Sequence, residues 1–241
     1  MADFSPASML ESALQNYSEA KPRSQQVAIG PSAIHSCRRQ VYHQIKGTFK
    51  TNRDTNFLPS LMGTAIHTMI EEALGSNYSD DIFGDDFLKE VPVEFEGLPG
   101  HIDLYIISKR MIVDWKTSTK SKLASTRYPW PSAQYKYQVH VYAYLLMNDP
   151  KYKALGYMVD TVAIIGVARD GGLQDIVEYL EPYNEELALQ GIKWINDQYA
   201  NAEKDVIPPP EKNAKTYCSL YCSFYDPTEK IGCPGLEKGG Y

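Results

Sequence analysis

The chain has 241 residues, of which 43% are hydrophobic and 22% are charged, a composition that is typical of a globular protein and excludes global disorder. No apolar stretch approaches the roughly 18 residues of a membrane-spanning helix, and the N-terminal residues have neither the basic start nor the apolar core of a secretory signal. Four cysteines are too few for a disulfide scaffold. We therefore expect a protein without a membrane partner in the reducing cytoplasm, or in the host cytoplasm if a phage encodes it.

The formal net charge of -6 argues by itself against a polyanionic partner such as nucleic acid. The charges are segregated, however. Five basic and no acidic residues lie between Cys37 and Arg53, and six basic residues with one acidic residue lie between Lys109 and Arg127. Acidic residues are concentrated at 71–96 and 170–186. This distribution is compatible with a basic groove on an acidic protein, although ordinary solvated faces of opposite sign would produce the same pattern.

The first predicted elements are helices. After a polar, Ser-rich segment at 1–29, Gly30-Pro31-Ser32 offers a helix start, and apolar residues follow at helical spacing from Ile34 to Ile45. That helix is expected to end at Gly47. A second helix is predicted from Pro59 to Leu74, with Gly75 as its stop.

From Val91 the apolar pattern alternates, which predicts three consecutive antiparallel strands with turns at Leu98-Pro99-Gly100 and at Ser108-Lys109-Arg110. The pattern then predicts a helix at 133–147, strands at 161–168 and 176–180, and a last helix at 184–200. This order predicts an α/β fold over residues 30–207, with a central mixed β-sheet flanked by helices. A tail at 208–241, which begins with three prolines, is too short to build its own core and completes a single domain.

Two aspartates and a lysine lie on the second and third predicted strands. If Ser108 and Lys109 form the turn, Asp103 faces Asp114 across the hairpin, and Lys116 lies on the same face as Asp114. Paired carboxylates need a cation, for which a divalent metal with oxygen ligands is the natural candidate. Lys116 would then orient an attacking water or stabilise a pentacovalent phosphorane. Ordinary surface charges, with Asp114 and Lys116 paired to each other, are the alternative.

These residues resemble the PD-(D/E)XK nuclease superfamily. The G-x-x-D motif that ends at Asp103 and the D-x-K-T motif that starts at Asp114 resemble its RecB-type branch. Two further motifs match in the same order, GxxxH from Gly63 to His67 and QxxxY from Gln138 to Tyr142, and in each the terminal residues share a helix face. The resemblance implies a restriction-endonuclease-like core.

The cysteines are unevenly placed, with Cys37 beside the basic helix and Cys218, Cys222 and Cys233 in the tail. This arrangement resembles the iron–sulfur subset of the superfamily, which includes AddB-type helicase–nucleases and CRISPR-associated RecB-like exonucleases. The resemblance implies a 4Fe–4S cluster that staples the tail to the N-terminal helix. The last interval, Ser223 to Gly232, is longer than in that family, so a structural Zn²⁺ held by four cysteines and free buried thiols are the alternatives.

The resemblance also implies roles for individual residues. The ligands of Mg²⁺ or Mn²⁺ would be His67, Asp103, Asp114 and the backbone carbonyl of Trp115. Lys116 would assist the water, and Gln138 and Tyr142 would position the DNA strand. Phosphate contacts are expected from Arg38, Arg39, Lys46, Lys120 and Lys122. Trp130, Tyr135 and Tyr137 are candidates for stacking on bases, and packing in the core is the alternative for some of them.

We therefore expect a metal-dependent DNA exonuclease that acts on single-stranded DNA or DNA ends. The expected settings are recombination, repair and phage DNA processing, with recombination or CRISPR proteins as candidate partners. A DNA-binding or assembly module that keeps the fold and the cluster but cuts nothing is the alternative. The presence of Asp103, Asp114 and Lys116 counts against that alternative.

Overall fold

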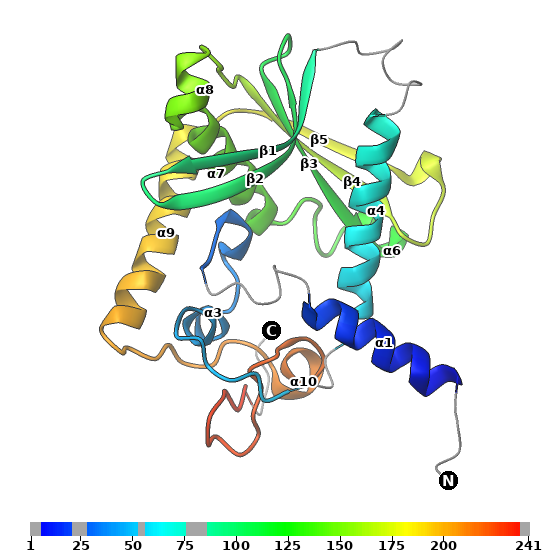
Figure 1. The fold of residues 1–241 in the computed structure, drawn as a ribbon, viewed down its shortest axis with the longest axis vertical. Helices are drawn as coiled ribbons and strands as arrows, with labels where there is room; N and C mark the ends of the chain where they lie inside the picture. Colours follow the sequence, from blue (N-terminus) through cyan, green and yellow to red (C-terminus); the bar gives the residue numbers. More distant parts are fainter. Residues whose placement is uncertain (1–5, 21–27, 53–55, 76–85, 237–241) are drawn as a thin grey trace. The chain divides into compact units, whose positions relative to one another are not determined.

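The computed structural model describes residues 6–20, 28–52, 56–75 and 86–236 (Figure 1). The chain forms two compact units. The cysteine unit comprises Met1–Ile29, Cys37–Leu61 and Val206–Tyr241, and the sheet unit comprises Gly30–Ser36 and Met62–Asp205. None of the described helices combines the length and the hydropathy that crossing a bilayer requires.

The described strands of the sheet unit form one mixed sheet in the order β1-β2-β3-β4-β5 (Figure 1). Only β3 and β4 pair in parallel, and the other neighbouring strands are antiparallel. This architecture confirms the predicted mixed sheet flanked by helices. The strands are β1 (Phe87–Phe95), β2 (Leu98–Ile106), β3 (Met111–Ser118), β4 (Thr161–Ala168) and β5 (Val177–Pro182).

Helices connect and cover these strands. The crossover between the parallel strands β3 and β4 runs through α7, which contacts β1, β2, β3 and β4 and packs against α9. The apolar run of β4 is buried because this strand is central, with Val162, Ala163 and Ile164 at most 1% exposed. The helices are α4 (Leu58–Gly75), α6 (Lys120–Leu123), α7 (Ala133–Asn148), α8 (Pro150–Ala154) and α9 (Glu185–Glu203).

Opposite faces of β3 meet different helices. Asp114 contacts Gln138 of α7, whereas Trp115, on the other face, packs in a cluster that includes Leu74 of α4. Strand side chains alternate, so a residue of β3 points either to α7 or to α4. Asp114 is therefore directed to α7.

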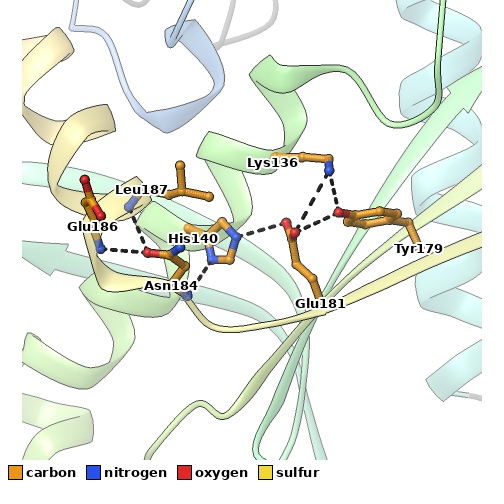
Figure 2. A network of polar contacts seen from close by, with 7 residues as sticks. All are labelled: Lys136, His140, Tyr179, Glu181, Asn184, Glu186 and Leu187. Atoms are coloured by element: carbon orange, nitrogen blue, oxygen red, sulfur yellow. Dashed lines mark hydrogen bonds and ion pairs between the residues drawn. The ribbon is translucent and has the colours of Figure 1, made fainter.

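A buried polar network anchors α7 to β5 and to the start of α9 (Figure 2). His140, which is 0% exposed, accepts the backbone N–H of Asn184 at Nδ1 over 3.2 Å. Its proton must then be on Nε2, which lies 3.0 Å from Glu181 Oε1 and donates to it. Burial lowers the pKa of His140, so the ring is neutral. Lys136 and Tyr179 complete the network around the same carboxylate.

The predicted turn between the first two strands was wrong. Leu98, Pro99 and Gly100 begin β2, and the turn lies at Glu96 and Gly97, whose φ angles are 51° and 77°. A two-residue hairpin turn of this type requires positive φ at both positions, which glycine provides. The Pro-Gly pair is a strong turn signal in sequence, but here it lies in paired strand.

The first predicted helix is also divided. Residues Pro31–Ala33 form a 3-10 turn, and the helix α3 begins only at Arg38 (Arg38–Ile45). His35, with φ of 56°, adopts a left-handed conformation that interrupts the helix. The structure adds elements that the sequence pattern did not predict, among them α6, α8 and η2 (Leu173–Asp175), and in the cysteine unit α1 (Pro6–Ala20), η3 (Ala214–Cys218) and α10 (Ser219–Tyr221).

Candidate active site and cysteine pocket

The pairing of β2 with β3 ends just before Asp103 and Asp114, which are two of the predicted metal ligands. Its last pair is Leu104 with Val113, in the register that the sequence predicted. Beyond it the strands separate, and Asp103 Oδ2 accepts the backbone N–H of Trp115 at 2.7 Å. The carboxylate takes the place of a strand carbonyl, so Asp103 is held beside Asp114 by the backbone itself.

Asp114 is buried, with 2% of its surface exposed, between a cation and an amide. Lys116 Nζ lies 2.6 Å from Asp114 Oδ2, and Gln138 Nε2 donates to Oδ1 at 3.4 Å. The ammonium approaches Oδ2 outside the angles of a hydrogen bond, so this buried oxygen accepts none from the described residues. The Lys116 ammonium compensates the charge of this oxygen, and a metal ion bound here would have to displace it.

His67 reaches the same site from α4. Its Nδ1 lies 3.8 Å from Asp103 Oδ2. Gly63, one turn earlier, allows the helix to approach β3 closely, because a Cβ there would lie 3.1 Å from Thr117 Oγ1. The GxxxH motif therefore has a geometric explanation, in which the glycine sets the distance between α4 and β3.

Two further carboxylates, which the sequence analysis missed, adjoin Asp103. Glu71 follows His67 by one helical turn, and Glu90 lies opposite Asp103 in the β1–β2 register, between the pairs Lys89↔Leu104 and Val91↔Ile102. Burial, followed by the charge of Asp114, raises the pKa of Asp103 to about 7. Burial comes first and a hydrogen bond that protonated Glu90 donates to Glu71 comes next among the causes that raise the pKa of Glu90 to about 8. Carboxyl groups are thus crowded here, and their raised pKa values favour the protonated forms, so a bound cation would let them ionise.

Gln138 and Tyr142 are both buried, at 4% and 6% exposure. Gln138 Nε2 donates to Tyr142 Oη at 3.0 Å as well as to Asp114. The two side chains of the QxxxY motif are thus brought together, as their helical spacing predicted, and Gln138 is the one that contacts Asp114 directly.

The predicted phosphate-binding residues have different surroundings in the two units. In the sheet unit, Lys120 Nζ pairs with Asp175 Oδ1 at 2.8 Å, and Lys122 is exposed on the same short helix. In the cysteine unit, Arg38 pairs with Glu211 at 2.5 Å, and Arg39 Nη1 donates to the carbonyl of Pro208 at 3.4 Å. Lys46 ends α3. Lys120 and Arg38 would have to exchange these carboxylate partners for phosphate.

All four cysteines belong to the cysteine unit and line one pocket. Each thiol is buried and free. Burial raises the pKa of Cys218 to about 11 and that of Cys222 to about 12, and it also raises the pKa of Cys233. The negative charges of the other thiolates add to each shift, so the four groups are electrostatically coupled.

Backbone contacts hold the cysteines in place. The amide of Asn52 lies at 3.0 to 3.4 Å from the carbonyl oxygens of Cys218, Ser219 and Cys222, to which it donates. Gly235, with φ of 71°, donates its N–H to Cys233 Sγ at 3.4 Å, and a Cβ on it would lie 3.1 Å from Cys218 Sγ. The Asn52 side chain and the Gly235 backbone thus both support the turns that carry the thiols.

The long interval before Cys233 is folded around Asp226. The Asp226 carboxylate accepts hydrogen bonds from the backbone and hydroxyl of Thr228 and from the N–H groups of Ile231 and Gly232. These hydrogen bonds hold the pKa of Asp226 well below its usual range, and the bond from the Thr228 hydroxyl contributes most. The loop closes where Cys233 N–H donates to Phe224 O at 2.8 Å. The extra residues therefore return Cys233 to the pocket.

A single metal ion finds no ready-made site in the described part of the chain, because no three His, Cys, Asp or Glu side chains are gathered closely enough to hold one. At the aspartates the chemistry of the donor set nevertheless fits a hard divalent cation, with carboxylate oxygens, an imidazole and the buried Asp114 Oδ2. Lys116 Nζ now occupies the space beside that oxygen.

Residues 83–226 match the family model described as the PD-(D/E)XK nuclease superfamily, which is more than half of the chain. The chain belongs to the PD-(D/E)XK nuclease superfamily. Its mixed five-stranded sheet flanked by helices agrees with that assignment. Nucleases of this superfamily generally use divalent metal ions such as Mg²⁺.

Solved structures include distant relatives in fold. The protein SSO0001 has a TM-score of 0.52 at 16% identity, covering 92% of this chain and 95% of its own. The alkaline exonuclease LHK-Exo from Laribacter hongkongensis has a TM-score of 0.47 at 11% identity, covering 76% and 92%. A phage-related exonuclease from Haemophilus somnus 129PT has a TM-score of 0.38 at 19% identity, covering 69% and 78%. The first likeness shows a shared fold alone, and the other two are too distant for a structural argument. No curated protein matches the chain in sequence.

Proposed function

We propose that this superfamily member is a metal-dependent deoxyribonuclease of the RecB-like type, an exonuclease that hydrolyses phosphodiester bonds in single-stranded DNA or at DNA ends. The observation that carries the proposal is the group of Asp103, Asp114 and Lys116 where β2 and β3 separate. The proposed setting is DNA recombination, repair or phage DNA processing in the cytoplasm, with recombination or CRISPR proteins as partners.

The metal, Mg²⁺ or Mn²⁺, would be held by His67, Asp103, Asp114 and the backbone carbonyl of Trp115. When bound, it would supply Lewis-acid stabilisation of the phosphoryl oxygens. Asp103 would release its proton on binding the cation, since its pKa of about 7 leaves it largely protonated below neutral pH.

The other residues of the site would donate hydrogen bonds or orient Asp114. Lys116 would leave Asp114 to donate a hydrogen bond to the attacking water or to the phosphoryl oxygen that gains charge. Gln138 keeps Asp114 oriented through its bond to Oδ1 and is itself fixed by Tyr142. This chain of contacts gives both QxxxY residues a role in the chemistry through the orientation of Asp114.

We propose a 4Fe–4S cluster for the cysteine pocket, bound by Cys37, Cys218, Cys222 and Cys233. Four buried thiols line one pocket, and backbone N–H groups approach the sulfurs of Cys222 and Cys233. A structural Zn²⁺ ion held by the same four thiolates is the alternative.

The experiment that tests the nuclease proposal uses anaerobically purified protein and end-labelled single-stranded DNA, with and without Mn²⁺. We expect metal-dependent release of labelled nucleotides by the wild type. Asp114→Asn should reduce cleavage by at least about 100-fold, because it removes a ligand charge while keeping the shape. Asp197→Asn, at an exposed position on α9, is the control and should cleave like the wild type.

Two outcomes would contradict the proposal. Cleavage that persists undiminished in Asp114→Asn would show that another site or a contaminant acts. Binding of DNA without cleavage under any metal condition would instead support the non-catalytic module.

A further inference from the structure

The segment between α6 and α7 places aromatic side chains beside Lys116. Lys116 Nζ lies 5.2 Å from the centroid of the Tyr135 ring, on the first turn of α7. The Tyr135 ring in turn meets Trp130 edge to face, with 5.5 Å between the ring centroids. An aromatic surface thus begins at the proposed site of hydrolysis and continues into the preceding loop.

Gly166 makes room for this surface. It is the β4 residue paired with Lys116, so the two lie side by side on the sheet. A Cβ at position 166 would lie 2.9 Å from Trp130 Cζ2 and 2.8 Å from Leu123 Cδ2. The same Cβ would lie 2.6 Å from Val177 Cγ2, so Gly166 leaves space that the side chains of Val177, Leu123 and Trp130 fill. The indole is held by packing, since its buried Nε1 has no hydrogen-bond partner among the described residues.

The outer end of the loop is exposed and positively charged. Tyr128 has 60% of its surface exposed, although it is a large aromatic residue, and its backbone N–H is fixed by Ser125 Oγ at 3.1 Å. The Arg127 guanidinium lies 5.3 Å from the Tyr128 ring centroid. From Lys116 to Lys136 the chain carries five basic and no acidic residues.

We propose that Tyr128, Trp130 and Tyr135 form a stacking surface that receives the unpaired bases of a single DNA strand and leads its backbone to Lys116. This inference rests on the proposed nuclease function and names its substrate class. Tyr128 is exposed beside Arg127, and Trp130 and Tyr135 are half-buried behind it in the chain. An exposed aromatic ring next to arginine stacks on any base, whereas the bases of a duplex have their faces covered by one another. The surface therefore favours single strands over duplex ends.

The test is equilibrium binding of fluorescein-labelled oligothymidylate and of a blunt duplex, measured by anisotropy with Ca²⁺ in place of Mn²⁺ to prevent cleavage. We expect Tyr128→Ala to weaken single-strand binding about tenfold and to change duplex binding less than about twofold. Tyr128→Phe keeps the ring and should bind as the wild type does. Tyr199→Ala removes another exposed tyrosine, on α9, and should change neither affinity.

The stacking surface is overturned if Tyr128→Ala binds oligothymidylate as tightly as the wild type, if Tyr128→Phe is as weak as Tyr128→Ala, or if both DNA forms lose affinity equally. Failure of the nuclease proposal looks different. A wild-type protein that shows this tyrosine-dependent preference but releases no nucleotides with Mn²⁺ supports the surface and contradicts the nuclease. Cleavage without the preference supports the nuclease and contradicts the surface.

Discussion

At the scale of residues, Glu90 shows how the negative charge of the site affects stability. Its folded pKa of about 8 lies above the ordinary value of a glutamate. Between about pH 4.5 and pH 8 the unfolded chain has released this proton and the folded chain still holds it, so the free energy of unfolding falls as pH rises. The loss of folding stability caused by Glu90 is complete above pH 8, and it is absent below the pKa that this glutamate has in the unfolded chain.

We therefore expect Glu90→Gln to raise the melting temperature of the metal-free protein at pH 9 and to leave it nearly unchanged at pH 4. The gain should be about 1 kcal/mol, well below the full shift, because the side chain is partly exposed. Scanning calorimetry in the presence of a chelator measures it. Glu94→Gln on the same strand is the control. An equal gain for both variants, or a gain that persists at pH 4, would contradict the explanation.

The same residue shows what the sequence could and could not predict. Asp103 and Asp114 could be paired from sequence because Ser108 and Lys109 lie in the turn between their strands, and the observed register agrees. Glu90 could not, because the turn before β2 was placed at Leu98-Pro99-Gly100. Only a turn at Glu96 and Gly97 brings Glu90 opposite Asp103. An error of about two residues in the position of the turn is therefore enough to change which residue is expected opposite Asp103.

At the scale of elements, the cysteine tail is held by more than its thiols. The sequence suggested that a Gly- and Pro-rich tail needs a metal staple, and it could not show that Asn52, far away in the chain, binds three carbonyls of the tail. Such contacts between a side chain and a distant stretch of backbone form only when the fold brings the two together, so they leave no local pattern in the sequence. The turn that carries Cys218 and Cys222 is therefore supported before any metal binds.

Asn52→Asp tests this support, because it keeps the shape but directs a carboxylate at three carbonyl oxygens. We expect it to destabilise the cysteine unit by about 2 kcal/mol and to lower the iron and sulfide bound per chain after reconstitution. Asn56→Asp is a matched control in the same segment, since Asn56 contacts Leu220 O through its backbone N–H. Iron retention in Asn52→Asp equal to that of the control would show that the amide does not hold the turn.

At the scale of the whole molecule, the two units differ in how they are held together. The sheet unit has a five-stranded sheet with a buried core within the described residues. The cysteine unit is assembled from three separate stretches of chain, Met1–Ile29, Cys37–Leu61 and Val206–Tyr241, and its four thiols come from two of them. A bound cluster would join those two stretches, so its binding free energy would stabilise this unit directly.

We therefore expect two calorimetric transitions in the cluster-loaded protein. Removal of the cluster by oxidation and chelation should shift the transition of the cysteine unit to lower temperature by at least about 10 °C, and the transition of the sheet unit should stay in place. Cys37→Ser should give the same profile without any treatment, because it removes the one ligand that the N-terminal stretches supply. Loss of both transitions together would show that the units do not fold independently. An unchanged profile after complete iron removal would show that Asn52 and Asp226 hold the tail without the cluster.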